Sequence, residues 1–421
     1  MSIKNKSSYM ETAINYIFVF FTILQCNSVF YSHSSVSNKV IMIIWILLMV
    51  IMFFKSLYGL FKNKINLIPL LRLLIPFVIL MTMFLLLEYS RYPFSVNYIL
   101  IYLIIPICMI TFFYGNFFKN TINEMFLEFR NIVLILSGLS LLFWILAIMG
   151  VSPNESLSIG WGGVHTVPGY FYMHFITQGS TDFLGINTIR NTGIFVEAPM
   201  YSYILSLAFV INLFLDSDSK LIDLKSGLLI VTILSTTSTT GIIVLFISII
   251  YYQLFIKNTF KYKMVKYMIS ILVILVTVIF LRIILQDKVD SVWYSSSSLR
   301  LDDFTSGYMS WMNHPIIGNG LRNDISIINN MNYKRVISGL TGLSSGLMMV
   351  LPYGGIILLL FYLVPTVLSM IISKNIFGVA FVAFILFAFT STGDVYIYII
   401  LLSYFWASYL IKKDVRGMEI V

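Results

Sequence analysis

Residues 131–150 read NIVLILSGLSLLFWILAIMG, a run that contains no charged side chain. A helix needs about 20 mainly apolar residues to cross the hydrocarbon core of a bilayer. Similar runs recur along the 421-residue chain, in which 59% of the residues are hydrophobic and only 11% are charged. Soluble proteins carry about 25% charged residues. The sequence therefore predicts an all-α integral membrane protein, and we expect residues 1–421 to form a single polytopic membrane domain.

About twelve transmembrane helices fit the hydrophobic pattern. The run at 13–31 lacks a small-residue cleavage site, so we expect a retained helix rather than a removed signal peptide. The stretch from Gly227 to Phe255 is too long for one crossing and short for two, and it is interrupted by the polar run 235–241. We expect two short helices that meet at this break. The expected spans are 13–31, 40–54, 67–87, 97–114, 131–150, 200–215, 226–237, 240–256, 266–285, 346–370, 376–391 and 395–411.

The basic residues predict how the chain crosses the membrane. The net charge is +9, but Lys and Arg lie in short segments between apolar runs, which is typical of membrane topology and not of a nucleic-acid-binding face. With the N-terminus in the cytoplasm, 18 of the 27 Lys and Arg residues fall on cytoplasmic segments. Both termini are then cytoplasmic, and 151–199 and 286–345 form two large extracytoplasmic loops. Because these loops are rich in aromatic residues, we expect them to fold and pack onto the helices.

The sequence indicates no metal site. Cys26 and Cys108 each lie inside an apolar run, which argues against a disulfide framework or a cysteine metal site. The four histidines show no spacing typical of metal ligands. They are His33, His165, His174 and His314.

A first polar pattern ends the first large loop, where Arg190 and Glu197 precede Pro199. Proline suits the first turn of a helix, and a carboxylate just before it can cap that helix and complement its dipole. Arg190 can equally be a charge that extends to the membrane interface. The functional alternative is an arginine that binds an anion and pairs with the carboxylate of Glu197.

A second polar pattern is the break at 235–241, which contains Ser238, Thr240 and Gly241. Its hydroxyls can bond back to the backbone of a kinked helix. Alternatively, the break forms the floor of a polar cavity beneath the outer loops, since such a run is tolerated in a membrane where it packs in protein or lines a cavity. A further pattern, Leu351–Gly355 in the tenth expected helix, predicts a kink or close helix packing.

The remaining pattern lies on the second large loop. Gly-x-Gly alone usually marks a turn, but here it follows an arginine, a tryptophan and a proline. These residue types suit a loop whose backbone N–H groups approach a phosphate. The residues are Arg300, Trp311, His314, Pro315, Gly318 and Gly320.

Taken in this order, the patterns resemble the bacterial polysaccharide polymerase and O-antigen ligase superfamily, in particular the Wzy-type polymerases. The resemblance spans about 190–356, and the first half of the chain is similar only in hydropathy. Family ligases often carry an arginine beside the serine of the break, where this chain has Thr239 and Thr240. They also tend to carry a histidine before the tenth helix, where 344–346 read SSG, and this difference favours a polymerase. The matching residues are Arg190, Gly193, Phe195, Glu197, Pro199, 238–241, Arg300, Trp311, Pro315, Gly318, Gly320, Gly354 and Gly355.

The resemblance implies a GT-C-like membrane glycosyltransferase in the bacterial inner membrane. Such an enzyme joins oligosaccharide repeat units carried on undecaprenyl pyrophosphate into O-antigen or capsule, on the outer face, without a cofactor. A chain-length regulator protein is a candidate partner. The leaving pyrophosphate needs charge stabilisation, which arginine provides by bidentate contacts, so Arg190 and Arg300 are the expected catalytic cations. We expect Arg322, Lys334 and Arg335 on the same loop to matter less.

We expect a base to activate the acceptor hydroxyl; Glu197 is one candidate, and His165, His174 and His314 are others. Substrate-binding roles are expected for Ser238, Thr240, Gly241, Trp311, His314, Gly318 and Gly320.

Other functions stay open. An O-antigen ligase uses the same donor. A lipid-linked oligosaccharide flippase or another transporter also has about twelve helices, but it should show internal repeats and ionisable residues near the membrane midplane, and neither is apparent here. A membrane acyltransferase is a further alternative, although no helix offers a clear catalytic histidine.

Overall fold

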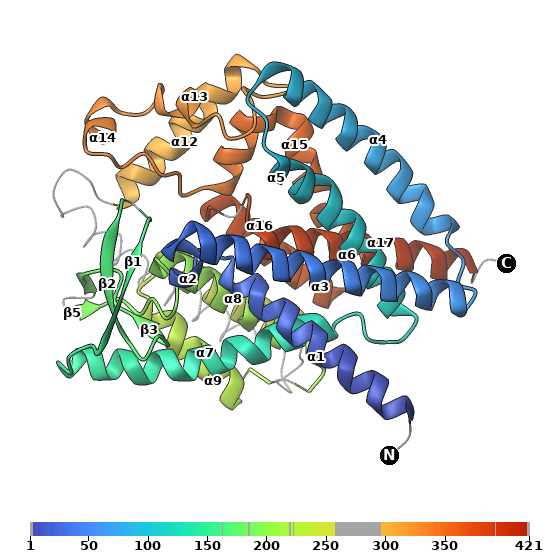
Figure 1. Ribbon diagram of the computed structural model, residues 1–421, viewed down its shortest axis with the longest axis horizontal. Helices are drawn as coiled ribbons and strands as arrows, with labels where there is room; N and C mark the ends of the chain where they lie inside the picture. Colours follow the sequence, from blue (N-terminus) through green and yellow to red (C-terminus); the bar gives the residue numbers. More distant parts are fainter. Residues whose placement is uncertain are drawn as a thin grey trace. The chain divides into compact units, whose positions relative to one another are not determined.

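The computed structural model describes residues 3–161, 163–183, 186–218, 220–221, 223–256, 296–391 and 393–418. It is mostly helical (Figure 1). The described residues group into two compact units. Unit 1 takes its residues from 1–49, 123–290 and 374–382, and unit 2 from 50–122, 291–373 and 383–421.

Unit 1 is organised around helix α8 (Ala198–Leu215), whose residues are buried along almost the whole length. Helix α8 packs against three neighbouring helices of the unit, because its side chains are apolar or small on every face. These neighbours are α7 (Glu124–Ile148), α9 (Leu224–Ser235) and α10 (Thr239–Tyr251), the last continued by the π-helix η2 (Tyr252–Ile256). The unit also contains α1 (Ile3–Leu24), α2 (Val29–His33) and the first parts of α3 (Ser35–Lys62) and α16 (Lys374–Phe389).

Two small antiparallel sheets complete unit 1, and both lie in the first large loop of the sequence. One has the order β1-β2-β3, with Ile159 opposite His165 and Tyr170 opposite His174. The other is a two-stranded hairpin, with Ser180 opposite Ile189. The strands are β1 (Glu155–Ile159), β2 (His165–Tyr170), β3 (His174–Phe175), β4 (Ser180–Phe183) and β5 (Ile186–Ile189).

Unit 2 is built on α17 (Tyr396–Met418), which packs against α6 (Ile105–Phe117) and α15 (Gly346–Met370). The second large loop contributes α12 (Ser296–Asn313), which lies against α15, and two short helices. The latter are α13 (Asp324–Ile328) and α14 (Tyr333–Ile337). The unit also contains α4 (Ile68–Arg91), α5 (Val96–Ile99), which leads through the π-helix η1 (Leu100–Ile104) into α6, and the second parts of α3 and α16.

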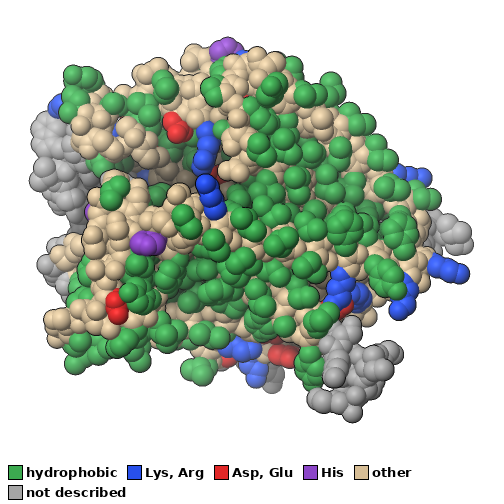
Figure 2. Space-filling view, viewed as in Figure 1, with side chains coloured by type: hydrophobic (Ala, Val, Ile, Leu, Met, Phe, Trp, Pro, Cys, Tyr) green, Lys and Arg blue, Asp and Glu red, His purple; other side chains and the backbone are tan. Residues whose placement is uncertain are grey.

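Seven helices of the described residues are long and apolar enough to cross a membrane, which makes the chain a multi-pass membrane protein. Figure 2 shows hydrophobic side chains over much of the visible face. Helix α4, for example, exposes Leu71, Ile75, Ile79 and Leu86. The seven spans are Ser35–Lys62, Ile68–Arg91, Val96–Phe117, Glu124–Ile148, Ala198–Leu215, Thr239–Ile256 and Gly346–Met370. The total of about twelve crossings stays a prediction, and the expected helix at 266–285 lies outside the described residues.

The expected helix at 13–31 is wrong at its C-terminal end. Helix α1 ends at Leu24, Asn27 adopts a left-handed conformation with φ 53°, and Ser28 forms a β-bridge with Phe195. Val29 then packs with apolar residues of β1, β2 and β3, so the end of this apolar run belongs to the core beneath the sheet. Two short helices around the polar break are confirmed, since α9 ends at Ser235 and α10 begins at Thr239.

Contacts inside each unit join segments that the Lys and Arg distribution places on the same side of the membrane. In unit 1, Arg130 pairs with Asp216 at 2.5 Å, and both belong to segments predicted inside. At the predicted outer end, the Nδ1 atom of His33 lies 2.7 Å from the carbonyl oxygen of Ser158. In unit 2, the predicted outer segments meet where Arg322 pairs with Asp394 at 2.6 Å. The relative sidedness of these segments is therefore consistent, while the absolute orientation stays a prediction.

Candidate functional site

Hydroxyl groups of the polar break stabilise the interruption between α9 and α10. Ser235 Oγ donates to the carbonyl of Thr232 at 2.8 Å, and Thr236 Oγ1 donates to that of Ile233 at 2.7 Å. Thr237 then adopts a left-handed conformation with φ 51°. These bonds to the backbone satisfy groups at the end of α9 that the next turn of a continuous helix would otherwise use. The result is a short buried segment of non-helical backbone between two apolar helices.

The segment after β5 inserts into this break. Asn191 N donates to the carbonyl oxygen of Ser235 at 3.1 Å, and its Nδ2 donates to Ser235 Oγ at 2.9 Å and to Ser140 Oγ at 3.3 Å. Arg190 Nε donates to the carbonyl oxygen of Thr236 at 3.1 Å. The two polar patterns that are about 45 residues apart in the sequence are thus one site in unit 1.

Asn191 and Ser140 belong to this site, and neither was assigned a role from the sequence. Asn191 is fully buried and bridges α7 to the break. The position of Asn191 directly after Arg190 was a signal that could have identified it. Ser140 gave no signal, because a single serine in an apolar helix is usually satisfied by its own backbone.

Glu197 occupies the N-cap position of α8 but makes no side-chain capping bond. The amide of Ala198 donates instead to Gln178 Oε1 at 3.0 Å. The prediction that the Glu197 side chain caps α8 is therefore wrong. Burial raises the pKa of the Glu197 carboxyl, and attraction to Arg190 offsets part of this shift. Glu197 and Arg190 therefore interact electrostatically beside the polar break, in a partly buried setting.

The two histidines of the first loop occupy opposite environments. His165 is exposed on β2. His174 is completely buried on β3, and neither ring nitrogen has a hydrogen-bond partner among the described residues. Burial lowers the pKa of His174 to about 4, so its imidazole is neutral and a weak base near pH 7.

In unit 2, the Gly-x-Gly loop packs directly on the backbone of α15. Gly318 N, Asn319 N and Gly320 N donate to the carbonyl oxygens of His314, Pro352 and Tyr353, at 2.8, 2.7 and 3.1 Å. These N–H groups therefore have protein partners in this structure, so the role of Gly318 and Gly320 in approaching a phosphate stays a prediction that the bonds do not favour. His314 and Trp311 lie next to the loop, with His314 Nδ1 2.8 Å from Asn319 Oδ1 and Trp311 Nε1 donating to the carbonyl of Pro315 at 2.9 Å.

The expected kink at Leu351–Gly355 is confirmed. Gly355 adopts φ 60° and ψ −155° inside α15, and a side chain there would overlap the backbone of Ile316. This kink leaves two amides of α15 to bond the loop: Ile356 N donates to the carbonyl of Pro315 at 2.9 Å, and Ile357 N donates to that of Ile316 at 3.2 Å. Glycine is required here because an L side chain strongly disfavours this conformation.

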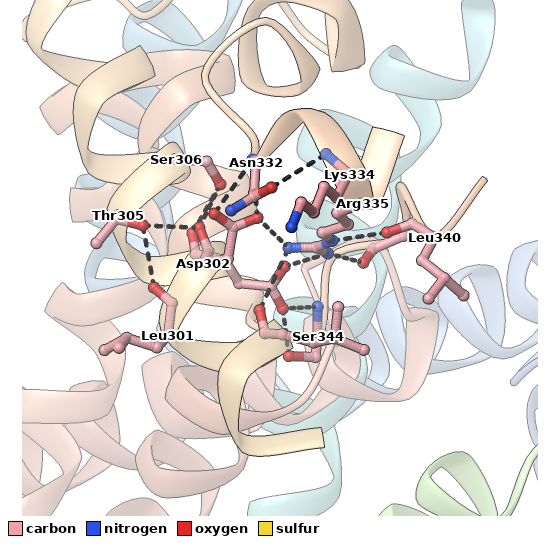
Figure 3. A network of polar contacts seen from close by, with 12 residues as sticks. Leu301, Asp302, Thr305, Ser306, Asn332, Lys334, Arg335, Leu340 and Ser344 are labelled. Atoms are coloured by element: carbon pink, nitrogen blue, oxygen red, sulfur yellow. Dashed lines mark hydrogen bonds and ion pairs between the residues drawn. The ribbon is translucent and has the colours of Figure 1, made fainter. Parts of the chain in front are cut away.

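Arg300 lies on α12, one turn before Asp303. Burial lowers the pKa of its guanidinium, and attraction to Asp303 offsets part of the effect. Asp303 is itself held by Arg335, whose Nη2 donates to it at 2.6 Å. Arg335 is only 2% exposed and also donates to Asp302 (Figure 3) and to three backbone carbonyls. Arg335 therefore joins α12 to the segment that contains Leu340 and Gly342. The expectation that Arg335 matters less to activity than Arg190 and Arg300 stays a prediction.

Arg190 belongs to unit 1 and Arg300 to unit 2. Their joint binding of one pyrophosphate stays a prediction. Within the ranges that the structure describes, no three His, Cys, Asp or Glu side chains are grouped closely enough to hold a metal ion. A scan against models of known protein families and a search of curated proteins find no match.

Proposed function

We propose that this chain is a membrane glycosyltransferase of the Wzy type, which polymerises oligosaccharide repeat units carried on undecaprenyl pyrophosphate. The proposed location is the outer face of a bacterial inner membrane. The product would be O-antigen or a capsular polysaccharide. The growing chain would leave its lipid carrier and pass to the sugar end of a new lipid-linked unit.

The observation that carries the proposal is the contact of Arg190 and Asn191 with the polar break at Ser235 and Thr236. The guanidinium of Arg190 is positioned by its Nε bond to the non-helical backbone between α9 and α10. Such a guanidinium is a suitable partner for an anionic headgroup. Departure of a pyrophosphate requires stabilisation of developing negative charge more than it requires a general acid. A cation fixed in a partly buried site provides that stabilisation, because a preorganised charge needs little rearrangement in the transition state.

Glu197 is the proposed base for the acceptor hydroxyl. Its raised pKa brings the carboxylate closer to the operating pH, where a general base is more effective. His174 is a poorer choice because burial lowers its pKa to about 4. His165 is exposed on β2, and His314 lies in unit 2 beside Asn319.

The first test is an in vitro polymerisation assay on purified full-length protein with lipid-linked repeat units. Arg190→Ala should lower turnover by about 100-fold or more, as loss of a transition-state charge partner typically does. Arg190→Lys keeps the charge but loses the bidentate geometry, so it should remain impaired. Lys39→Ala is the matched control, since Lys39 is an exposed cation of unit 1 on a segment predicted outside. Near-normal turnover of Arg190→Ala at equal protein level would refute the proposed role.

The glycan phenotype of a deletion strain separates this function from its alternatives. A polymerase is indicated by single repeat units on the surface. Intact polymer that is not attached to the lipid core indicates a ligase. Accumulation of lipid-linked units in the cytoplasm indicates a flippase.

A further inference from the structure

Helix α12 of unit 2, which lies against α15 (Figure 1), has the reverse of the side-chain arrangement that a helix has in water. A helix bounded by water buries its apolar side chains and exposes its polar ones. Here the buried face carries a carboxylate and small residues, while the outward face carries four large apolar side chains, each more than half exposed. The buried residues are Asp303, Ser306, Gly307 and Ser310, and the exposed ones are Leu301, Tyr308, Met309 and Met312.

The buried face of α12 approaches its neighbours closely because its side chains are small. A Cβ atom at Gly307 would lie only 2.8 Å from Met348 Cβ on α15. Ser310 Oγ donates to Ser326 Oγ on α13 at 3.1 Å. Small residues and hydroxyl bonds between helices are typical of helix packing inside membranes. The buried side of α12 is therefore built as membrane helices are, and its outward side is the apolar one.

The exposed face of α12 continues into an exposed apolar row on α15. Ile316, shortly after the end of α12, is exposed, and its carbonyl accepts from Ile357 N at 3.2 Å. The adjacent Ile356 is exposed as well, and Leu360 and Val367 follow on the same face of α15. Because α15 is long and apolar enough to cross a membrane, lipid covers this row. The outward surface of α12 is thus joined to a lipid-facing surface.

The polar residues of α12 place it at the membrane surface and not across the hydrocarbon core. Arg300 and Asp302 lie in its first turns, and the helix is not among the seven candidate spans of the described residues. The rings of Tyr308 and Trp311 pack edge to face at 5.7 Å, and Trp311 Nε1 donates to the carbonyl of Pro315. Tryptophan and tyrosine are enriched where hydrocarbon meets the lipid headgroups.

We propose that α12 lies in the interfacial layer of the bilayer, with its exposed apolar face against acyl chains. Lipid is the occupant that continuity with α15 indicates, and amphipathic helices bind this layer through such a face. At α12 the second large loop is therefore seated on the membrane and does not stand clear of it in water. The proposal goes beyond the proposed function and does not depend on it, because it concerns only the medium that covers α12.

The test is the collision accessibility of nitroxide spin labels, measured by EPR on the full-length protein in phospholipid nanodiscs. The labels are attached at Met309→Cys and Met312→Cys. The native Cys26 and Cys108 are buried, so their background labelling should be low. Oxygen concentrates in hydrocarbon, whereas a charge-neutral nickel chelate stays in water. If α12 faces lipid, oxygen should collide with both labels more often than the chelate does.

Two further variants calibrate the ratio of oxygen to nickel collisions. Leu360→Cys on α15 is the lipid reference, and Lys334→Cys, at an exposed charged position of the same loop, is the water reference. Both α12 labels should give ratios closer to that of Leu360→Cys. Melting temperatures close to that of the wild type establish folding, and Leu301→Cys supplies another position on the same face if one variant fails to fold.

Two results would overturn the proposal. A ratio at α12 like that of Lys334→Cys would show that this face lies in water. Few collisions with either reagent would show that protein covers it, whether a second copy of this chain or a different one.

These results are separable from the proposed function. Arg190→Ala should leave the collision ratios unchanged, because Arg190 lies in unit 1. A chain that forms no polymer but gives lipid-like ratios at Met309→Cys and Met312→Cys would refute the polymerase proposal and support this one.

Discussion

At the scale of single residues, Arg335 shows how strongly burial changes the consequence of removing a charge. Its guanidinium forms ion pairs of 2.9 Å with Asp302 and 2.6 Å with Asp303, and Asp303 is only 1% exposed. Arg335→Ala would leave that carboxylate buried without its partner. We expect a loss of stability of about 3–5 kcal/mol, typical of a broken buried pair. The melting temperature in detergent measures it.

Lys334→Ala is the matched control for Arg335, because Lys334 is the exposed cation next to it in sequence. Surface substitutions usually change stability by less than about 0.5 kcal/mol. Equal melting temperatures for the two variants would contradict the structural role of Arg335. Arg335 should therefore not serve as a neutral comparison in tests of Arg300, which lies on the helix that it holds.

His174 makes a residue-scale prediction about pH. The folded-state pKa of about 4 lies below the ordinary value of 6.5. Between these values the unfolded chain binds a proton that the folded chain does not, so stability is lost as the pH falls from 6.5 toward 4. The full loss is on the order of 3 kcal/mol. His174→Phe should flatten the dependence of melting temperature on pH across this window, whereas His165→Phe, at an exposed position, should leave it unchanged. Parallel curves for wild type and His174→Phe would refute this assignment.

At the scale of elements, the contact between α8 and α10 depends on Gly241. A Cβ atom at Gly241 would overlap Ser202 Oγ and lie 3.3 Å from Ile233 Cγ2. Gly241→Ala should therefore destabilise unit 1, by about 1–3 kcal/mol as overpacking usually does. Since Ser202→Ala removes the overlapping hydroxyl, the double variant should recover much of the lost stability. The measurement is the melting temperature of the two single variants and the double variant.

The Gly241 comparison also distinguishes packing from substrate binding. If Ser202→Ala restores both the melting temperature and the polymer yield of Gly241→Ala, the glycine acts through helix packing. Recovery of stability without recovery of polymer would instead support a direct role for Gly241 in substrate binding. A double variant as unstable as Gly241→Ala would refute the packing account.

At the scale of the whole molecule, the predicted topology can be tested by labelling single cysteines in intact cells. The native Cys26 and Cys108 are both buried, so their background labelling should be low. Val164→Cys and Tyr333→Cys lie at exposed positions of the two loops predicted outside, and should react with a membrane-impermeant thiol reagent. Leu224→Cys is 90% exposed on a segment predicted inside and should react only after permeabilisation. The reverse labelling pattern would overturn the orientation.

The sequence by itself determined the membrane class, the positions of most helices and the polar break, because hydrophobic length and composition are local properties. Tertiary structure alone decided the contacts of Asn191 with Ser140 and Ser235 and the hydrogen bonds of the Arg335 guanidinium, since these partners are far apart in the chain. The same holds for the end of α1, where Val29 follows the apolar pattern of a membrane helix but packs with the sheet. Hydropathy records that a side chain avoids water and carries no information about whether lipid, a sheet or another helix covers it. Which of these covers a given apolar side chain is decided only when the whole chain packs.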